Sequence, residues 1–345
     1  MKIFFDTTPL HNGHAGRGIG VYTENLIAAL KKNPSTGVFQ GPIKAGGFEC
    51  DLIHYPFFDF FFHTLPFINP TKVVVTIHDT IPLIYQDVVK PGIRGRLKHL
   101  LQRLALKGVS AVITDSQNSK NDIVRYLGVP QHKIFAIPLA VDEKFVQFSQ
   151  IKPKPSALPP LPDKYILYVG DINYSKNLPQ LIKAFSDSTY DGDLVIVSRA
   201  MGGNRQIPES RAIITEISHS SKKGRVHLLT DCGPDLLPAI YQKAHYYIQP
   251  SLYEGFGLPL LEAFYARIPV ACANTSSLPE VAGDAAVYFD PRNLSSIIQI
   301  LNSLSLQSSA YRQEQIAKGT AQLETFSWTQ TARATMDVYR KVLGL

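Results

Sequence analysis

The sequence predicts an α/β protein built from two doubly wound domains, each a parallel sheet covered by helices on both faces. Three observations predict this fold. The chain has 345 residues, which is enough for two domains of ordinary size. Short, continuous apolar runs alternate with helix-length periodic segments, as in parallel sheets whose two faces are both buried. A proline-rich segment interrupts this alternation near the middle of the chain.

The predicted strands follow this alternation along the chain. Nine runs rich in β-branched and aromatic residues are predicted to be strands. Helix-length periodic segments separate them, so neighbouring strands should run parallel. The predicted strands cover residues 2–5, 73–77, 111–114 and 133–137 before the proline-rich segment, and 165–169, 194–197, 226–229, 246–249 and 270–273 after it.

Residues 151–163 are the predicted linker between the two domains. Five prolines stand among the 11 residues from Lys152 to Pro162, and proline opposes both regular helix and interior strand. The first domain is therefore expected at 1–150 and the second at 164–327. In open α/β sheets ligands bind beyond the carboxyl ends of the strands, so residues that follow a strand are the candidate site residues.

The composition excludes several classes of protein. No run approaches the roughly 18 apolar residues of a membrane-spanning helix, and Asp6 comes too early for a signal peptide. Three isolated cysteines, Cys50, Cys232 and Cys272, provide neither a disulfide framework nor a CxxC site. We therefore expect a cytoplasmic protein.

The net charge of +7 belongs mainly to the first half of the chain. Residues 1–163 hold 18 basic and 12 acidic side chains, a balance of +6, and residues 164–345 hold 17 and 16, a balance of +1. This excess is compatible with an anionic membrane, a phosphorylated substrate or nucleic acid. Because the chain contains no recognised nucleic-acid-binding module, no nucleic-acid partner is expected.

A basic amphipathic helix is predicted at residues 90–107. Its apolar residues recur at helical spacing, so we expect them to pack in the core. Its basic residues would face solvent or anionic lipid. An aromatic run at 55–62 follows a strand-like segment at 52–54 in the same domain. The candidate residues for a membrane-facing or substrate-facing surface are Arg94, Arg96, Lys98, Arg103, Phe58 and Phe61.

Three loops contain candidate binding residues. The glycine-rich turn 11–20 around Gly18 enters a helix at 21–30, and fits either a phosphate contact or a plain flexible turn. His78 follows a strand, and either acts at a site or caps a loop. Lys176 lies just before a predicted helix, and either neutralises a phosphate or is solvated.

Residues 250–263 form the most informative segment. They follow the strand at 246–249, and Pro259 suits the first turn of a helix. Glu254 then lies in a glycine-rich loop and Glu262 in the helix. Carboxylates accept hydrogen bonds from hydroxyls and glycine amides donate to phosphate, so the segment can bind a polyol phosphate. Glu262 is alternatively a favourable acid near a helix N-terminus.

Residues 254–262 resemble the E-x7-E motif of retaining GT-B glycosyltransferases, in particular glycosyltransferase family 4, the group 1 glycosyltransferases. The resemblance extends over nearly the whole chain. It implies a GT-B architecture of two Rossmann-like domains facing a central cleft, with a C-terminal helix at about 328–345 that returns to the first domain. The other matching segments are 18–23, 76–79, 114–116, 168–170, 176–178, 268–271 and 276–286.

The resemblance also implies a role for each matching residue. Glu262 would bind the ribose hydroxyls of a nucleotide sugar, Lys176 would neutralise its diphosphate, and Gly18 would contact that diphosphate. His78 would contact the transferred sugar, and His78, Glu254 and Lys176 would be the catalytic residues. Glu254 would hold the sugar and the distal phosphate with the backbone of its own loop, which comprises Gly255, Phe256, Gly257 and Leu258.

Two positions depart from the family pattern. Asp171 stands where the family often has arginine, which halves the expected basic clamp around the diphosphate. Residues 230–235 replace the commoner turn near the nucleobase, so the resemblance assigns no base.

No metal and no cofactor other than the donor substrate are expected. Asp191-Gly192-Asp193 has the DxD form of metal-dependent glycosyltransferases. It precedes the strand at 194–197, however, and so lies at the wrong end of the sheet to bind a donor.

The expected function is metal-independent, retaining transfer of a hexose of mannose or glucose type from a GDP- or UDP-sugar. The acceptor would be a hydroxyl of a glycan or a lipid-linked molecule, in cell-surface polysaccharide or glycolipid synthesis. A further hypothesis is that the first domain docks on the anionic inner face of the cytoplasmic membrane. Two alternatives stay open: a catalytically silent nucleotide-sugar-binding scaffold of the same fold, and an NAD-dependent dehydrogenase that binds its cofactor at residues 16–20.

Overall fold

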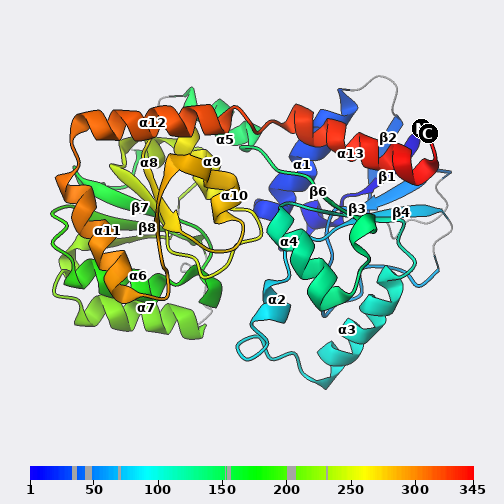
Figure 1. The fold of residues 1–345 in the computed structure, drawn as a ribbon, viewed down its shortest axis with the longest axis horizontal. Helices are drawn as coiled ribbons and strands as arrows, with labels where there is room; N and C mark the ends of the chain where they lie inside the picture. Colours follow the sequence, from blue (N-terminus) through cyan, green and yellow to red (C-terminus); the bar gives the residue numbers. More distant parts are fainter. Residues whose placement is uncertain are drawn as a thin grey trace. The chain divides into compact units, whose positions relative to one another are not determined.

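The computed structural model describes residues 1–32, 37–42, 49–68, 71–151, 153, 157–199, 207–230 and 232–345. The described chain divides into two compact units (Figure 1). Unit 1 comprises Met1–Asp142 and Phe326–Leu345, and unit 2 comprises Glu143–Thr325. Each unit is a parallel sheet with helices on both faces, as predicted.

Unit 1 is built on a six-stranded sheet in the order β2-β1-β3-β4-β5-β6. The inner strands are buried on both faces, which is why their sequences are continuous apolar runs. The strands are β1 (Lys2–Asp6), β2 (Gly37–Gly41), β3 (Leu52–Tyr55), β4 (Lys72–Thr76), β5 (Ala111–Thr114) and β6 (Ile134–Ala136). The helices are α1 (Gly18–Lys31), α2 (Ile81–Ile84), α3 (Ile93–Leu106), α4 (Gln117–Asp122) and α13 (Trp328–Leu343).

Unit 2 repeats this plan with the strand order β12-β11-β10-β7-β8-β9. The strands are β7 (Tyr165–Val169), β8 (Asp193–Val197), β9 (Val226–Leu229), β10 (Tyr246–Gln249), β11 (Val270–Ala273) and β12 (Ala286–Phe289). The helices are α5 (Glu143–Ser149), α6 (Leu178–Asp187), α7 (Pro208–His219), α8 (Leu237–Lys243), α9 (Leu258–Tyr265), α10 (Leu278–Ala282), α11 (Leu294–Leu306) and α12 (Ser309–Leu323). Because β7 and β10 are neighbours, the loops that follow them meet at one edge of the sheet.

The nine predicted strands are all present, and no predicted end differs from the observed end by more than one residue. The sequence did not predict β2 and β12. These are the outermost strands of their sheets and are only partly buried, so they lack the continuous apolar pattern of inner strands.

The boundary between the units lies between Asp142 and Glu143, before the proline-rich segment. The short helix α5 belongs to unit 2, because Phe145 packs edge-on against Tyr241 and Tyr265, with ring centroids 5.5 and 6.1 Å away. Within the predicted linker at 151–163, residues 152 and 154–156 lie outside the described residues.

The last helix, α13, belongs to unit 1. Trp328 Nε1 donates to the carbonyl of Val141 at 2.8 Å, and the Tyr339 hydroxyl lies 2.5 Å from His54 Nδ1. His54 Nε2 in turn lies 2.8 Å from Thr76 Oγ1 of β4. Burial and the neighbouring His78 lower the pKa of His54 to about 3, so its imidazole is neutral in this network. These contacts join the end of the chain to the middle of the first sheet.

Candidate active site

The loops that follow β7 and β10 are joined by direct hydrogen bonds. The backbone N–H of Leu252 donates to the carbonyl of Ser175 at 2.7 Å, and Asn177 Nδ2 donates to the carbonyl of Pro250 at 3.2 Å. Asn177 has a left-handed backbone conformation with φ 57°, which ends the first loop and starts α6. The two loops are therefore one structural unit at the carboxyl edge of the sheet.

Lys176 and Glu254 form a buried ion pair across these loops. Lys176 Nζ lies 2.7 Å from each carboxylate oxygen of Glu254, and the two side chains are 17% and 9% exposed. Gln249 Nε2 and Ser251 Oγ also donate to Glu254 Oε1, each at 2.7 Å. Burial of this kind requires that the charges be paired, and each charge here holds the other in place.

The glycine loop before α9 has a fixed backbone. Ser277 Oγ lies within hydrogen-bond reach of the carbonyls of Glu254 at 3.0 Å and Phe256 at 2.9 Å. Gly257 has φ 109°, and a Cβ there would lie 2.9 Å from Leu278 Cδ2, so only glycine fits. The loop thus leads into the N-terminus of α9, which begins at Leu258 and favours anions.

Glu262 lies in α9, as predicted, and is positioned by a tyrosine. The Tyr241 hydroxyl of α8 donates to Glu262 Oε2 at 2.7 Å. Burial and the Glu262 carboxylate raise the pKa of Tyr241, so the phenol keeps its proton. Sequence reasoning missed Tyr241, Gln249 and Ser251. Gln249 and Ser251 carried a signal, because both are polar residues at or just beyond the end of an apolar strand.

The other predicted donor-side positions lie in the same unit. Asp171 is exposed in the loop after β7, and the Tyr168 hydroxyl donates to its backbone carbonyl at 3.1 Å. In the turn at 230–235, residue 231 lies outside the described residues, and Cys232 is buried.

His78 pairs with Asp115 at the carboxyl edge of unit 1. His78 Nδ1 lies 2.7 Å from Asp115 Oδ2, and Nε2 lies 3.0 Å from the carbonyl of Pro56. Burial lowers the pKa of His78, but the charge and hydrogen bond of Asp115, with the Pro56 carbonyl, outweigh it and raise the pKa. Both ring nitrogens are thus engaged within unit 1. Sequence reasoning gave Asp115 no role, although it directly follows β5, the neighbour of β4.

Gly18 is the first residue of α1. A Cβ at Gly18 would meet no atom within 4 Å, whereas a Cβ at Gly20 would lie 2.6 Å from the carbonyl oxygen of His14. Packing within unit 1 therefore explains glycine at position 20 but not at position 18.

The DxD-like sequence lies at the amino end of β8, as predicted. Asp191 pairs with Lys164 at 2.5 Å, and Asp193 pairs with Arg225 at 3.0 Å and with His227 at 2.6 Å. In the described part of the chain, no group of three or more His, Cys, Asp or Glu residues is arranged to hold a metal ion.

The structure corrects two expectations for the first domain. Phe58 is 3% exposed and belongs to the core, and Phe61 is half-buried against it, because the aromatic run folds inward over the sheet. The apolar residues of α3 were expected in the core, but most of them are exposed. Arg94, Arg96, Lys98 and Arg103 are exposed, as a surface role requires. None of the described helices is long and apolar enough to cross a bilayer.

This chain resembles known families and proteins over most of its length. The family model for Glycosyl transferases group 1 matches residues 150–322, and that for Glycosyltransferase Family 4 matches residues 41–145. The chain is 29% identical over 296 residues to O-antigen chain mannosyltransferase B of Escherichia coli, covering 82% of this chain and 74% of that protein. It is 28% identical over 286 residues to the serotype-specific mannosyltransferase WbdA of Escherichia coli, covering 79% of this chain and 34% of that protein.

Solved structures share the fold. A sucrose-phosphate synthase from Thermosynechococcus elongatus has a TM-score of 0.77 at 16% identity, covering 100% of this chain and 99% of that chain. HepE of Anabaena, crystallised in complex with UDP and glucose, has a TM-score of 0.72 at 14% identity, covering 99% and 100%. The shared fold is GT-B, with two Rossmann-like domains.

Proposed function

The chain belongs to the group 1 glycosyl transferases, and from this premise we propose that it is a metal-independent, retaining hexosyltransferase that uses a nucleotide diphosphate sugar. The observation that carries the proposal is the buried pair of Lys176 and Glu254 beside the N-terminus of α9. A leaving diphosphate needs positive charge and N–H donors that are in place before the reaction. This edge of unit 2 supplies both.

Lys176 is the proposed electrostatic catalyst. Its ammonium carries three N–H groups, and two of them serve the two oxygens of Glu254, which leaves one for a phosphate oxygen. Glu254 Oε1 receives three hydrogen bonds and Oε2 receives one from Lys176, so Oε2 is the oxygen with capacity for a sugar hydroxyl. The proposed role of Glu262 is to accept from the ribose hydroxyls.

In the proposed step, the bond between the anomeric carbon and the distal phosphate oxygen breaks. The acceptor oxygen forms its bond to that carbon on the same face, and its proton passes to the leaving phosphate. Metal independence is proposed because Lys176 supplies an ammonium and the backbone amides supply N–H donors at this edge, whereas Asp191 and Asp193 are paired with cations at the opposite edge. His78 and Gly18 keep their proposed roles at the sugar and the diphosphate.

The proposed donor is a GDP- or UDP-hexose of mannose or glucose type, and the acceptor is a glycan or a lipid-linked hydroxyl. Support for mannose comes from the Escherichia coli relatives, which are named mannosyltransferases, and support for UDP from the HepE complex. We further propose a cytoplasmic location, with unit 1 in contact with an anionic membrane through its exposed basic residues.

A second candidate is a catalytically silent nucleotide-sugar-binding scaffold. It is favoured by Asp171, an exposed carboxylate in the loop where the family often has arginine. An acid beside a diphosphate weakens its binding and the stabilisation of the leaving group.

The deciding experiment offers GDP-mannose, GDP-glucose and UDP-glucose together with a crude lipid and glycan extract. The proposal expects release of nucleotide diphosphate from one donor, unchanged by a chelator, and an α-configured product by NMR. Saturable donor binding without release would favour the scaffold. Activity lost with the chelator and restored by Mg²⁺, or an inverted product, would overturn the corresponding part of the proposal.

A further inference from the structure

Helix α3 packs on unit 1 through Gln102, Ala105 and Leu106 and turns a second, apolar stripe outward. Gln102 is buried, and its Oε1 accepts from the backbone N–H groups of Thr64 at 2.9 Å and Leu65 at 3.0 Å. The outward stripe is between 47% and 88% exposed and consists of Ile93, Leu97, Leu100 and Leu104. This is the reverse of an ordinary amphipathic surface helix, whose apolar stripe faces the core.

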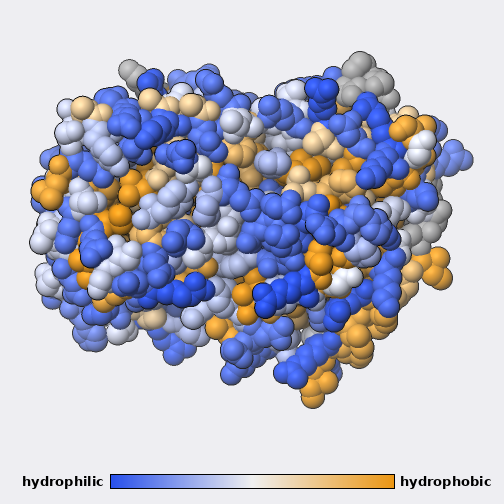
Figure 2. Space-filling view, viewed as in Figure 1, coloured by the Kyte–Doolittle hydropathy of each residue, from blue (hydrophilic) through white to orange (hydrophobic). Residues whose placement is uncertain are grey.

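Basic residues flank the stripe on both sides. At about 100° per residue, the four apolar side chains fall within an arc of about 60° on the helix. Arg94 and Lys98 lie on one side of this arc, and Arg96, Arg103 and Lys107 on the other. Phe62 extends the apolar surface, since it is 64% exposed and its ring lies 5.0 Å from Lys98 Nζ. Figure 2 shows hydrophobic and hydrophilic residues side by side over α3.

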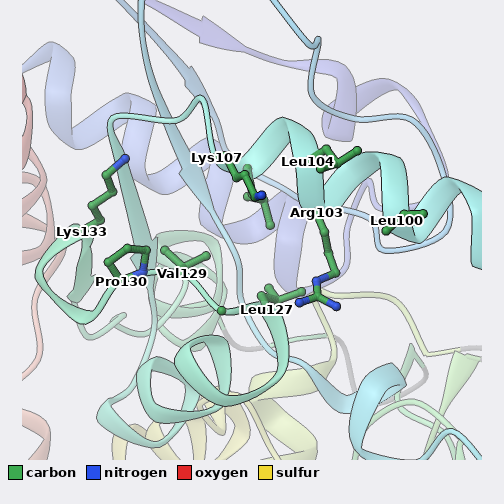
Figure 3. A pocket seen from close by; sticks show the side chains of 10 residues that line it. Leu100, Arg103, Leu104, Lys107, Leu127, Val129, Pro130 and Lys133 are labelled. Atoms are coloured by element: carbon green, nitrogen blue, oxygen red, sulfur yellow. The ribbon is translucent and has the colours of Figure 1, made fainter.

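A cavity of about 470 Å³ opens beside the second half of the stripe. Figure 3 shows Arg103 and Lys107 reaching it from α3, with Lys133 on the other side. Apolar side chains, among them Leu104, Leu127 and Val129, form the rest of its lining, and no acid lines it. In the part of the chain that the structure describes, these three cations have no ion-pair partner, although Lys133 donates to the carbonyl of Val109.

Within unit 1, the cavity lies at the opposite edge of the sheet from His78. Lys107 lies between α3 and β5, four residues before the strand, and Lys133 directly precedes β6, so both lie towards the amino ends of these strands. His78 follows β4 at the opposite, carboxyl edge of the same sheet. A molecule in the cavity would therefore lie at the edge of the unit 1 sheet that is opposite to His78.

We infer that the cavity binds the phosphate of an anionic bilayer lipid, while the stripe of α3 lies in the membrane interface. Arginine and lysine suit a phosphate, and the apolar wall suits the lipid's glycerol and acyl stem. The outward face of α3 has an apolar stripe with basic residues on both borders. Helices that lie in an anionic membrane interface have the same arrangement. A second copy of the chain fits less well, because an isologous contact would bring five cations against five. The inference rests on the proposed function in that it names the lipid partner of the membrane-bound enzyme.

The test uses co-sedimentation of the full chain with phosphatidylcholine vesicles, with and without roughly a third phosphatidylglycerol. The cavity variant is Arg103→Gln/Lys107→Gln/Lys133→Gln, and the charge-matched control is Lys223→Gln/Lys243→Gln/Arg333→Gln, whose residues are exposed in unit 2 and on α13. We expect about a hundredfold weaker binding to anionic vesicles for the cavity variant and nearly unchanged binding for the control. An equal loss of vesicle binding in both variants would mean that binding depends on general charge attraction. It would overturn the proposed lipid site in the cavity.

Two further measurements distinguish lipid binding in the cavity from membrane insertion of the stripe, and both from nucleotide-sugar binding. Monomeric short-chain phosphatidylglycerol should raise the Tm of the wild type but not of the cavity variant; inorganic phosphate giving the same rise would overturn a lipid site. Ile93→Ser/Leu97→Ser changes two exposed stripe residues that do not line the cavity and should abolish sedimentation. Retained sedimentation would overturn insertion of the stripe. Stabilisation by a nucleotide sugar is measured in parallel. If stabilisation by a nucleotide sugar is present without vesicle binding, this inference and the proposed membrane contact fail, and the proposed glycosyl transfer stands. If vesicle binding is present without stabilisation by any nucleotide sugar, the lipid site stands and the proposed glycosyl transfer fails.

Discussion

Lys176 and Glu254 are 78 positions apart in the sequence and form two hydrogen bonds of 2.7 Å between two adjacent loops. Because both side chains are largely buried, removing one partner leaves an uncompensated charge. We expect Glu254→Gln to lower the free energy of unfolding by about 3–5 kcal/mol in a urea titration. Asp187→Asn breaks the exposed pair with Lys183 and should cost at most about 0.5 kcal/mol. Equal costs for the two variants would contradict the structural role of the buried pair.

Lys176→Ala tests the role proposed for the lysine at the leaving group. Loss of one preorganised donor to a developing charge lowers a rate by about 100- to 1000-fold. We expect a loss of this size in nucleotide diphosphate release, measured with a coupled assay at saturating donor. Lys183→Ala, on the exposed face of α6, is the control. A Lys176→Ala protein with normal turnover would remove the lysine from the mechanism.

Tyr241→Phe tests whether the tyrosine positions Glu262. The change deletes only the hydroxyl that donates to Glu262 Oε2, and such a bond to a charged group contributes about 1.5–3 kcal/mol. We expect weaker donor binding by calorimetry and almost no further loss when Tyr241→Phe is combined with Glu262→Ala, because both act through one carboxylate. Additive losses would show that Tyr241 acts elsewhere.

The pair of His78 and Asp115 predicts a pH-dependent stability. The pKa of His78 is raised in the folded protein, so this contribution is fully present below the unfolded pKa of about 6.5 and is lost as pH rises through the folded pKa. Asp115→Asn should cost about 1–3 kcal/mol in mildly acidic buffer and less in alkaline buffer. The check is chemical denaturation of both proteins across this range, and a difference that grows with pH would contradict the assignment.

Substitution by alanine is predicted to affect stability differently at Gly257 and at Gly18. At position 257, an alanine would have to adopt a backbone φ of 109°, and its Cβ would lie 2.9 Å from Leu278 Cδ2. We therefore expect Gly257→Ala to lower the free energy of unfolding by about 1–3 kcal/mol. Gly18→Ala meets no atom within 4 Å and should change stability by less than about 0.5 kcal/mol. If Gly18 contacts the diphosphate, its variant nevertheless loses donor affinity, which thermal denaturation with and without donor detects.

The inner strands, the two-unit plan and the family were all predictable from the sequence. Inner strands of parallel sheets, such as β7 and β10, are apolar along their whole length, so composition alone marks them. The segment from Glu254 to Glu262 could also be recognised from the sequence as a candidate site, because its glycines, Pro259 and carboxylates follow a strand directly.

Which residues these elements bring together depends on the tertiary structure. The pairs Lys176 with Glu254 and His78 with Asp115 join separate loops, and their formation depends on which strands are neighbours. The outward stripe of α3 has the same cause. Helical periodicity shows that Ile93 and Leu104 share a face, but what covers that face depends on the rest of the fold. Here Gln102, Ala105 and Leu106 occupy the inward positions instead.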